Sequence, residues 1–261
     1  MEDVLSVFRG IGSEAITLLR GLHDGREVVG ENPLGQNSLK ADVELEKLVV
    51  KKLNESGLGG VLETEEQGRV ELGGGPYNFV CDPLDGSGNY YRKVPFYGLV
   101  LGASKGDRYD DLVCSYVINL VSGDEYWATE EGAFLNGEKI QSSNLTDITK
   151  SIAEFDPHEG EVVYDQVLPV LKACKDVRRL GANALGFCFL AHGGTHVFLN
   201  LNSSLSAIHA PGLRIAEKAG CVVSDENGGK INPKLELQEK LNFVCSANKE
   251  LHKQVLELLR K

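Results

Sequence analysis

The chain has 261 residues, of which 42% are hydrophobic and 25% charged, and these values are ordinary for a globular protein. Its formal charge of −11, from 38 acidic and 27 basic residues, argues against a nucleic-acid-binding protein, which would normally carry a basic face. No apolar run reaches the roughly 18 residues that a membrane-spanning helix requires. An anionic ligand would therefore need a local device, such as a metal ion or a helix N-terminus, to overcome the overall negative charge.

The six cysteines show no C-x-x-C spacing, and most lie among apolar residues, as in "FVCDP", "GFCFLA" and "NFVCSA". This pattern is typical of buried, reduced thiols in a cytosolic protein. The N-terminal segment is amphipathic and carries acids but no basic region, so it does not resemble a signal peptide. We expect a cytoplasmic protein without membrane association.

The first half of the chain predicts two helices followed by strands. Apolar residues recur at helical spacing over 4–22 and again over 39–57. The segments "GGVLETEEQG" and "YNFVCDPLDG" each predict a strand that stops at acidic residues. Three strand-like stretches joined by Gly and Asp turns over 96–140 predict an antiparallel meander.

After about residue 143 the pattern changes to an alternation of helices and strands, which indicates a different architecture in the second half. We therefore divide the chain into an N-terminal α+β half, 1–145, and a C-terminal α/β half, 146–261. The helices are expected at 162–174, 182–194, 210–220 and 248–261. A strand is expected at 195–201, a strand leading into a turn at 221–229, and a short strand or a loop at 176–181.

The stretch "DPLDG" is the first candidate for a metal-binding site. Pro83 suits a sharp turn directly after a strand, and such a turn lets Asp82 and Asp85 converge. The Leu84 carbonyl is then free to face the same point, and three oxygens form the kind of ligand set that Mg²⁺ prefers. The Gly86–Ser87–Gly88 segment permits close backbone approach, with free N–H groups for a phosphate if a helix begins there. The alternative is an ordinary turn, because all these residues favour turns.

Other acids could reach the same place. Glu65 and Glu66 also follow a short apolar strand, so they could lie at the same end of the sheet. Asp42 begins a helix after a Gly/Asn-rich stretch, where helix capping is its alternative role. A group of metal-binding carboxylates beside a phosphate-binding turn is the arrangement that metal-assisted phosphoester hydrolysis requires.

These motifs together resemble the inositol monophosphatase/fructose-1,6-bisphosphatase superfamily of Mg²⁺-dependent phosphatases. "ETEEQG", "DPLDGSGN", "EEGAFLNGEKI", "VRRLGANALGFCFLAHGG" and "RIAEKAGCVVSDENG" follow the family order over nearly the whole chain. The resemblance is strongest to archaeal and bacterial enzymes that accept inositol or fructose phosphates. It implies a layered αβαβα sandwich of the inositol monophosphatase type, a small phosphorylated substrate and a homodimer.

The resemblance also implies the metal ligands. Glu65, Asp82 and the Leu84 carbonyl would hold a first Mg²⁺, and Asp82 and Asp85 would contribute to a second. Glu66 would support them from behind.

It further implies the groups that handle water and phosphate. Asp42 and Ser87 would orient or deprotonate the attacking water, with Ser87 where many relatives have threonine. The amides of Gly86, Ser87 and Gly88 would hold the phosphate, and Glu65 would be a catalytic residue as well as a ligand.

One expected ligand is missing. The family supplies another carboxylate to the second metal, and the corresponding position is Ile208, in a stretch without any Asp or Glu. The neighbouring His209 is either a structural residue or a ligand that Mg²⁺ accepts poorly. Upstream, Gln36 stands near where relatives often have an acid that supports a third metal.

Two hypotheses remain. The chain is either a Mg²⁺-dependent phosphomonoesterase acting on a small polyol or sugar phosphate, or a catalytically impaired paralogue that binds a phosphorylated metabolite or a protein partner. The retained Glu65, Asp82, Asp85 and Ser87 favour the active enzyme.

Overall fold

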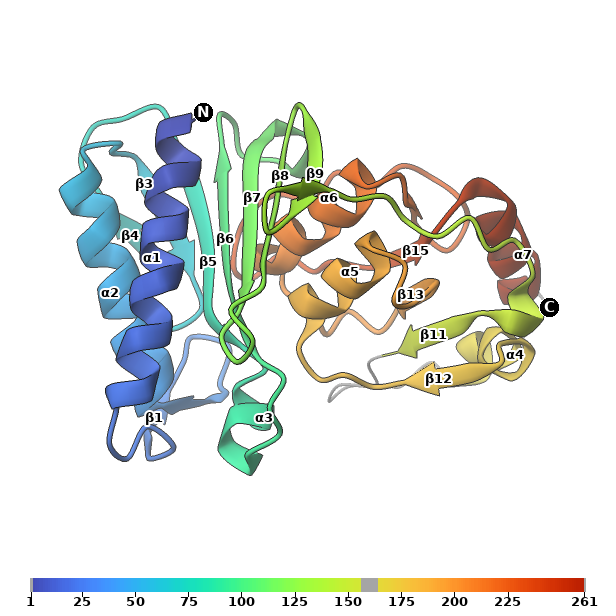
Figure 1. Cartoon of the computed structure of the whole chain (residues 1–261), viewed down its shortest axis with the longest axis horizontal. Helices are drawn as coiled ribbons and strands as arrows, with labels where there is room; N and C mark the ends of the chain where they lie inside the picture. The colour runs from blue at the N-terminus through green and yellow to red at the C-terminus, as the bar shows by residue number, and fades with distance from the viewer. Residues whose placement is uncertain (1, 156–163, 261) are drawn as a thin grey trace.

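The computed structural model describes residues 2–155 and 164–260, and the elements form five layers (Figure 1). Helices α1 (Glu2–Gly21) and α2 (Lys40–Ser56) cover one face of a large sheet. Helices α5 (Asn183–Ala191) and α6 (Ala210–Lys218) lie between that sheet and a smaller one. Helices α4 (Tyr164–Ala173) and α7 (Lys249–Leu259) form the outer layer on the far side. The predicted αβαβα sandwich is confirmed.

The large sheet has eight strands, and the meander predicted over 96–140 is present as the antiparallel strands β6 to β10. In spatial order the strands are β10 (Glu138–Lys139), β9 (Gly132–Leu135), β8 (Glu125–Thr129), β7 (Leu112–Asn119), β6 (Gly98–Ser104), β5 (Asn78–Asp85), β3 (Val61–Thr64) and β4 (Gly68–Glu71). Strands β3 and β5 are parallel neighbours, with Thr64 paired to Cys81. Glu65, directly after Thr64, and Asp82, directly after Cys81 inside β5, therefore lie at neighbouring positions of the sheet.

The smaller sheet has five strands, of which three are parallel. Their order is β12 (Asp176–Arg178), β11 (Ile152–Phe155), β13 (Val197–Asn200), β15 (Phe243–Ser246) and β14 (Val222–Ser224). Outside both sheets lie the hairpin of β1 (Val28–Glu31) and β2 (Asn37–Leu39) and the short helix α3 (Ser87–Arg92). The division at residue 145 stays a prediction.

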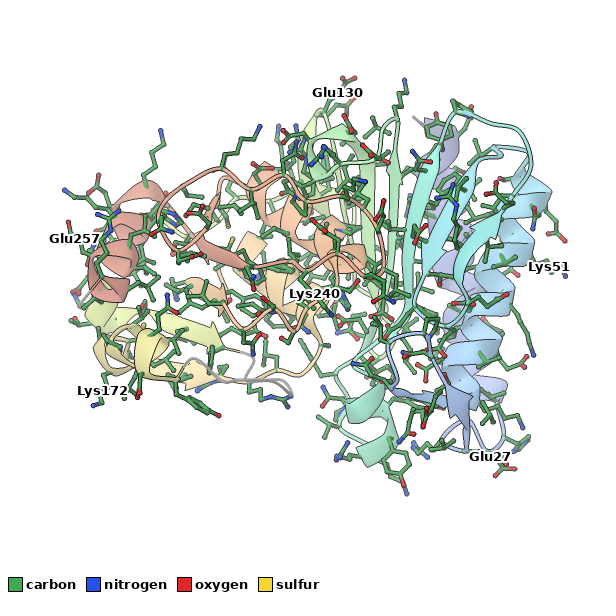
Figure 2. The ribbon with its side chains drawn as sticks, turned by 180° about the vertical axis from the view of Figure 1, so that it is seen from behind. Glu27, Lys51, Glu130, Lys172, Lys240 and Glu257 are labelled. Atoms are coloured by element: carbon green, nitrogen blue, oxygen red, sulfur yellow. The ribbon has the colours of Figure 1, made fainter. Side chains whose placement is uncertain are left out.

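Helix composition follows from layer position. Helix α5 is apolar almost all round, and its residues from Ala184 to Cys188 are all buried, because it lies between two sheets. The outer helices are amphipathic, and charged side chains such as Lys51 and Lys172 project from them into solvent (Figure 2).

Two core clusters result, one between α1, α2 and the large sheet and one around α5, α6 and the small sheet. Five of the six cysteines are buried, and Cys174 is half-buried. Among the described residues, no helix is both long and apolar enough to cross a membrane.

Candidate active site

The site begins at a break in strand β5. Between Asp82 and Asp85 the pairing of β5 with β6 shifts register, where Pro83 has no N–H to offer the ladder. The N–H of Leu84 donates instead to Asp82 Oδ1 at 2.9 Å. The predicted sharp turn is thus an irregularity inside strand β5. Both aspartates, each about 2% exposed, still lie near the end of the neighbouring strand β3.

Asp85 connects strand β5 to helix α5. Its Oδ1 accepts from the Asn183 N–H at 2.8 Å, and its Oδ2 accepts from Ala184 and Leu185 at 2.7 and 3.3 Å. These are the first amides of α5, which have no partner within their own helix. The carboxylate therefore caps α5 from the opposite sheet, with its negative charge at the positive end of the helix.

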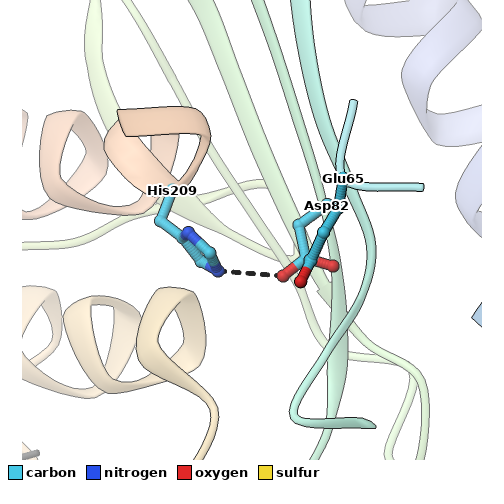
Figure 3. Close-up of side chains that lie close together, drawn as sticks. All are labelled: Glu65, Asp82 and His209. Atoms are coloured by element: carbon cyan, nitrogen blue, oxygen red, sulfur yellow. Dashed lines mark ion pairs between the residues drawn. The ribbon is translucent and has the colours of Figure 1, made fainter. Parts of the chain in front are cut away.

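Glu65 follows β3 and lies beside Asp82 (Figure 3). Asn32 Nδ2 contacts Glu65 Oε1 at 3.4 Å, while Asn32 Oδ1 accepts from the N–H groups of Leu34 and Gln36 at 3.0 Å each. These hydrogen bonds connect the loop between β1 and β2 to Glu65. Gln36, where an acid was considered for a third metal, is part of this loop and bonds Asn32 through its side chain at 3.4 Å.

Glu66 and Asp42 contact the segment that leads from β2 into α2. Ser38 Oγ donates to Glu66 Oε2, and the Leu39 N–H donates to Asp42 Oδ2 at 2.7 Å, so Asp42 does cap the start of α2. Capping does not remove Asp42 from the site, because the charges of Glu66 and Asp82 both act on it.

One supporting acid was missed by the sequence reasoning. Glu46, on α2, accepts from Thr64 Oγ1 at 2.5 Å and from the Glu66 N–H at 3.0 Å with one oxygen, and from Gln67 Nε2 at 2.6 Å with the other. Glu46 lies on the buried, mostly apolar face of α2, and a buried acid needs partners. That position was the signal by which the sequence could have indicated a supporting role.

The carboxyls repel one another strongly. Burial, reinforced by the charge of Glu66, raises the pKa of Asp42 to about 8. Burial also raises the pKa of Glu66 and of Asp85 to about 7, and burial together with Asp82 raises the pKa of Glu65 well above its ordinary value. Such a cluster is stabilised by a cation placed between its members.

The turn after β5 requires glycine. Gly86 has φ +91°, and a Cβ there would lie 2.9 Å from Ala182 Cβ and 3.1 Å from the Gly181 carbonyl oxygen. The chain enters α3 directly after it, with Ser87 half-buried and Gly88 exposed. The Leu84 side chain is buried in the core under α1 and α2. The roles predicted for these four backbone positions stay predictions.

The expected acid position and its neighbour are arranged differently from what the sequence suggested. Ile208 is wholly buried in the apolar cluster around α5 and α6. His209 instead places Nε2 2.9 Å from Asp82 Oδ2 and 3.7 Å from Asp85 Oδ1. Burial disfavours the charged imidazole, but the hydrogen bond to Asp82 and the charges of both aspartates outweigh it and raise the pKa of His209.

The residues fit a divalent cation. Donor atoms of Glu65, Asp82 and His209 all lie within 4.8 Å of one another. The carboxylate oxygens suit Mg²⁺, whereas the imidazole nitrogen suits a softer ion.

Comparison with known proteins identifies the family of the chain. The whole chain, residues 1–261, matches the inositol monophosphatase family. A fructose-1,6-bisphosphatase/inositol-1-monophosphatase from Archaeoglobus fulgidus is 37% identical over 201 residues, covering 76% of this chain and 74% of that protein. A bifunctional NADP phosphatase/NAD kinase from Methanococcus maripaludis is 29% identical over 280 residues, covering 98% of this chain and 48% of that longer protein.

The fold is also shared with solved structures. A crystal structure of an inositol monophosphatase–fructose 1,6-bisphosphatase has a TM-score of 0.85 at 23% identity, covering 97% of this chain and 98% of that one. The chain therefore belongs to the inositol monophosphatase family, a family of metal-dependent phosphomonoesterases.

Proposed function

We propose that this protein hydrolyses the phosphate monoester of a small polyol or sugar, of the inositol monophosphate or fructose 1,6-bisphosphate class. The observation that carries the proposal is the convergence of Glu65, which follows β3, with Asp82, which lies inside the parallel strand β5, and Asp85 and a glycine turn lie beside them. The whole-chain family match supports the same reaction class.

Metal binding is assigned to the convergent oxygens. Glu65, Asp82 and the Leu84 carbonyl would hold a first divalent cation, and Asp82 and Asp85 would contribute to a second. Mg²⁺ is the cation that the family resemblance implies. Such a cation polarises the phosphoryl oxygens and makes a bound water acidic enough to attack phosphorus.

The chain's own groups would position the substrate and move the proton. The amides of Gly86, Ser87 and Gly88 would bind the phosphate. Asp42 and Ser87 would orient the attacking water or accept its proton. Glu66 would support the ligands from behind through its hydrogen bond with Ser38.

The test is phosphate release from inositol, fructose, glycerol and nucleotide phosphates in the presence of Mg²⁺ or Mn²⁺. We expect release from at least one ester, and Asp82→Asn should abolish it because the ligand shared by both cations loses its charge. The exposed Glu138→Gln is the matched control, and its activity should equal that of the parent protein. No release from any ester at high metal concentration would contradict the proposal.

A catalytically impaired paralogue is the second candidate, and the observation favouring it is Ile208 in place of the expected acid. Such a protein would bind a phosphorylated metabolite or a partner protein without turnover. A phosphorylated ligand would then raise the melting temperature while no phosphate is released. Homodimerisation and a cytoplasmic location remain predictions alongside either function.

A further inference from the structure

His209 occupies an unusual place for a histidine. It ends a short 3₁₀ turn, Ala207–His209, that leads into α6, and it is 8% exposed. The imidazole points across the gap between the two halves toward the carboxylates of Asp82 and Glu65 (Figure 3). Its nearest contact there is the 2.9 Å approach of Nε2 to Asp82 Oδ2.

The other ring nitrogen fixes the tautomer. His209 Nδ1 lies 3.2 Å from the Ser206 carbonyl oxygen, which can only accept, so Nδ1 carries a proton and donates it. In the neutral ring the Nε2 lone pair then faces carboxylate oxygens, and this contact is repulsive unless a proton on Nε2 or a metal cation lies between them. A donated Nδ1–H to a backbone carbonyl is also the support that metal-ligating histidines usually have.

The spacing suits coordination. Two neighbouring ligands of one metal ion, each about 2.1 Å from it, are roughly 3 Å apart. The Nε2–Oδ2 separation matches that value, and Glu65 supplies a third donor within the same small volume. Ile208 cannot supply the missing oxygen, because its side chain is buried in the apolar core.

We propose that His209 Nε2 is a ligand of the metal ion at this site, and that the site consequently prefers a first-row transition-metal ion, Mn²⁺, Co²⁺ or Zn²⁺, over Mg²⁺. Imidazole nitrogen binds these ions well, whereas Mg²⁺ strongly prefers oxygen. The inference rests on the proposed function only in placing a cation at these carboxylates.

The experiment is pulsed electron paramagnetic resonance on the full-length, metal-free protein loaded with one equivalent of Mn²⁺. We expect a ¹⁴N hyperfine coupling to the bound Mn²⁺, replaced by a ¹⁵N coupling when the protein is made with ¹⁵N-labelled histidine. His209→Gln should remove the coupling and weaken Mn²⁺ binding by at least about tenfold. His23→Gln, at an exposed histidine in the loop after α1, is the control and should change neither.

Calorimetric titration supplies the second readout. The parent protein should bind Mn²⁺ more tightly than Mg²⁺, and His209→Asp, which returns an oxygen donor, should reduce that ratio. A Mn²⁺ complex without nitrogen coupling, or with a coupling that persists in His209→Gln, would overturn the inference. Phosphate release with no nitrogen coupling would leave the proposed function intact, and nitrogen coupling with no phosphate release would leave only the metal assignment.

Discussion

Three hydrogen bonds from the segment 64–67 converge on the Glu46 carboxylate. Glu46 is connected to the predicted metal ligand Glu65 through this segment. Because Glu65 lies between two of the bonded residues, Glu46 fixes the backbone from which Glu65 reaches Asp82. It acts as a positioning residue.

Glu46→Gln should therefore weaken both folding and metal binding. An amide cannot accept at both ends, so one set of these donors loses its partner, and the free energy of unfolding should fall by about 1–3 kcal/mol. Metal affinity, measured by calorimetry on the folded protein, should fall as well, because Glu65 is held less firmly.

Glu44→Gln is the matched control on the same helix. Glu44 pairs with the exposed Lys47 at 2.8 Å, and a surface pair of this kind contributes about 0–1 kcal/mol. If Glu46→Gln binds metal as tightly as Glu44→Gln does, the loop does not depend on Glu46.

Helix α5 and strand β5 meet at Asp85, which serves two purposes with one side chain. As a cap it needs acceptor oxygens for three amides, and as a metal ligand it needs negative charge. The asparagine and alanine variants separate these needs, because asparagine keeps one oxygen and alanine keeps none.

Asp85→Asn should destabilise the metal-free protein less than Asp85→Ala does, since asparagine keeps one acceptor oxygen for the α5 amides and also removes a buried charge that Asp82 repels. The rise in melting temperature on adding metal should be smaller than in the parent. Asp85→Ala should lower the melting temperature even without metal, because buried amides of α5 lose their partner. Thermal unfolding of the three proteins with and without metal gives the comparison, and equal metal-induced shifts in all of them would exclude Asp85 as a ligand.

At the scale of elements, periodicity predicted the long helices, the antiparallel meander and the strands that lead to Glu65 and Asp82. The strand predicted to stop at Asp82 instead continues to Asp85. Strands β4, β11 and β15 and the β1–β2 hairpin were not predicted, because they are short and are formed by pairing with neighbours rather than by a pattern of their own. The predicted helix at 162–174 is present as α4 from Tyr164, and its first two residues lie outside the described part of the chain.

The site shows the same limit. Local spacing could bring Asp82 and Asp85 together, but His209 reaches them only because the second half packs against the first. A lone histidine in an apolar stretch gives no such signal, and the family pattern directed attention to Ile208 instead. Contacts between segments distant in sequence are fixed by packing, which a single sequence does not display.

At the scale of the whole molecule, the carboxyls between the two sheets connect stability, pH and metal. The pKa values of Asp42, Glu66 and Asp85, about 8, 7 and 7, lie above the ordinary values of 3.8 and 4.5. Between pH 5 and 8 the folded metal-free protein therefore holds more protons than the unfolded chain, so these groups make it less stable as pH rises. His252, whose pKa burial lowers to about 4, acts in the opposite direction below its ordinary value of 6.5.

A bound metal ion should reverse the effect of the carboxyls. Metal competes with protons for the same oxygens, so its affinity, and with it the stabilisation of the folded state, should increase as the pH rises from 5.5 to 8. The measurement is the melting temperature with and without a fixed concentration of Mn²⁺ across that range. His252 lies outside the site, so its contribution is the same in both series and cancels in the difference. The metal-induced shift should be largest at pH 8 and should be lost in Asp82→Asn, whereas a shift that does not change with pH would mean that the metal binds away from these carboxyls.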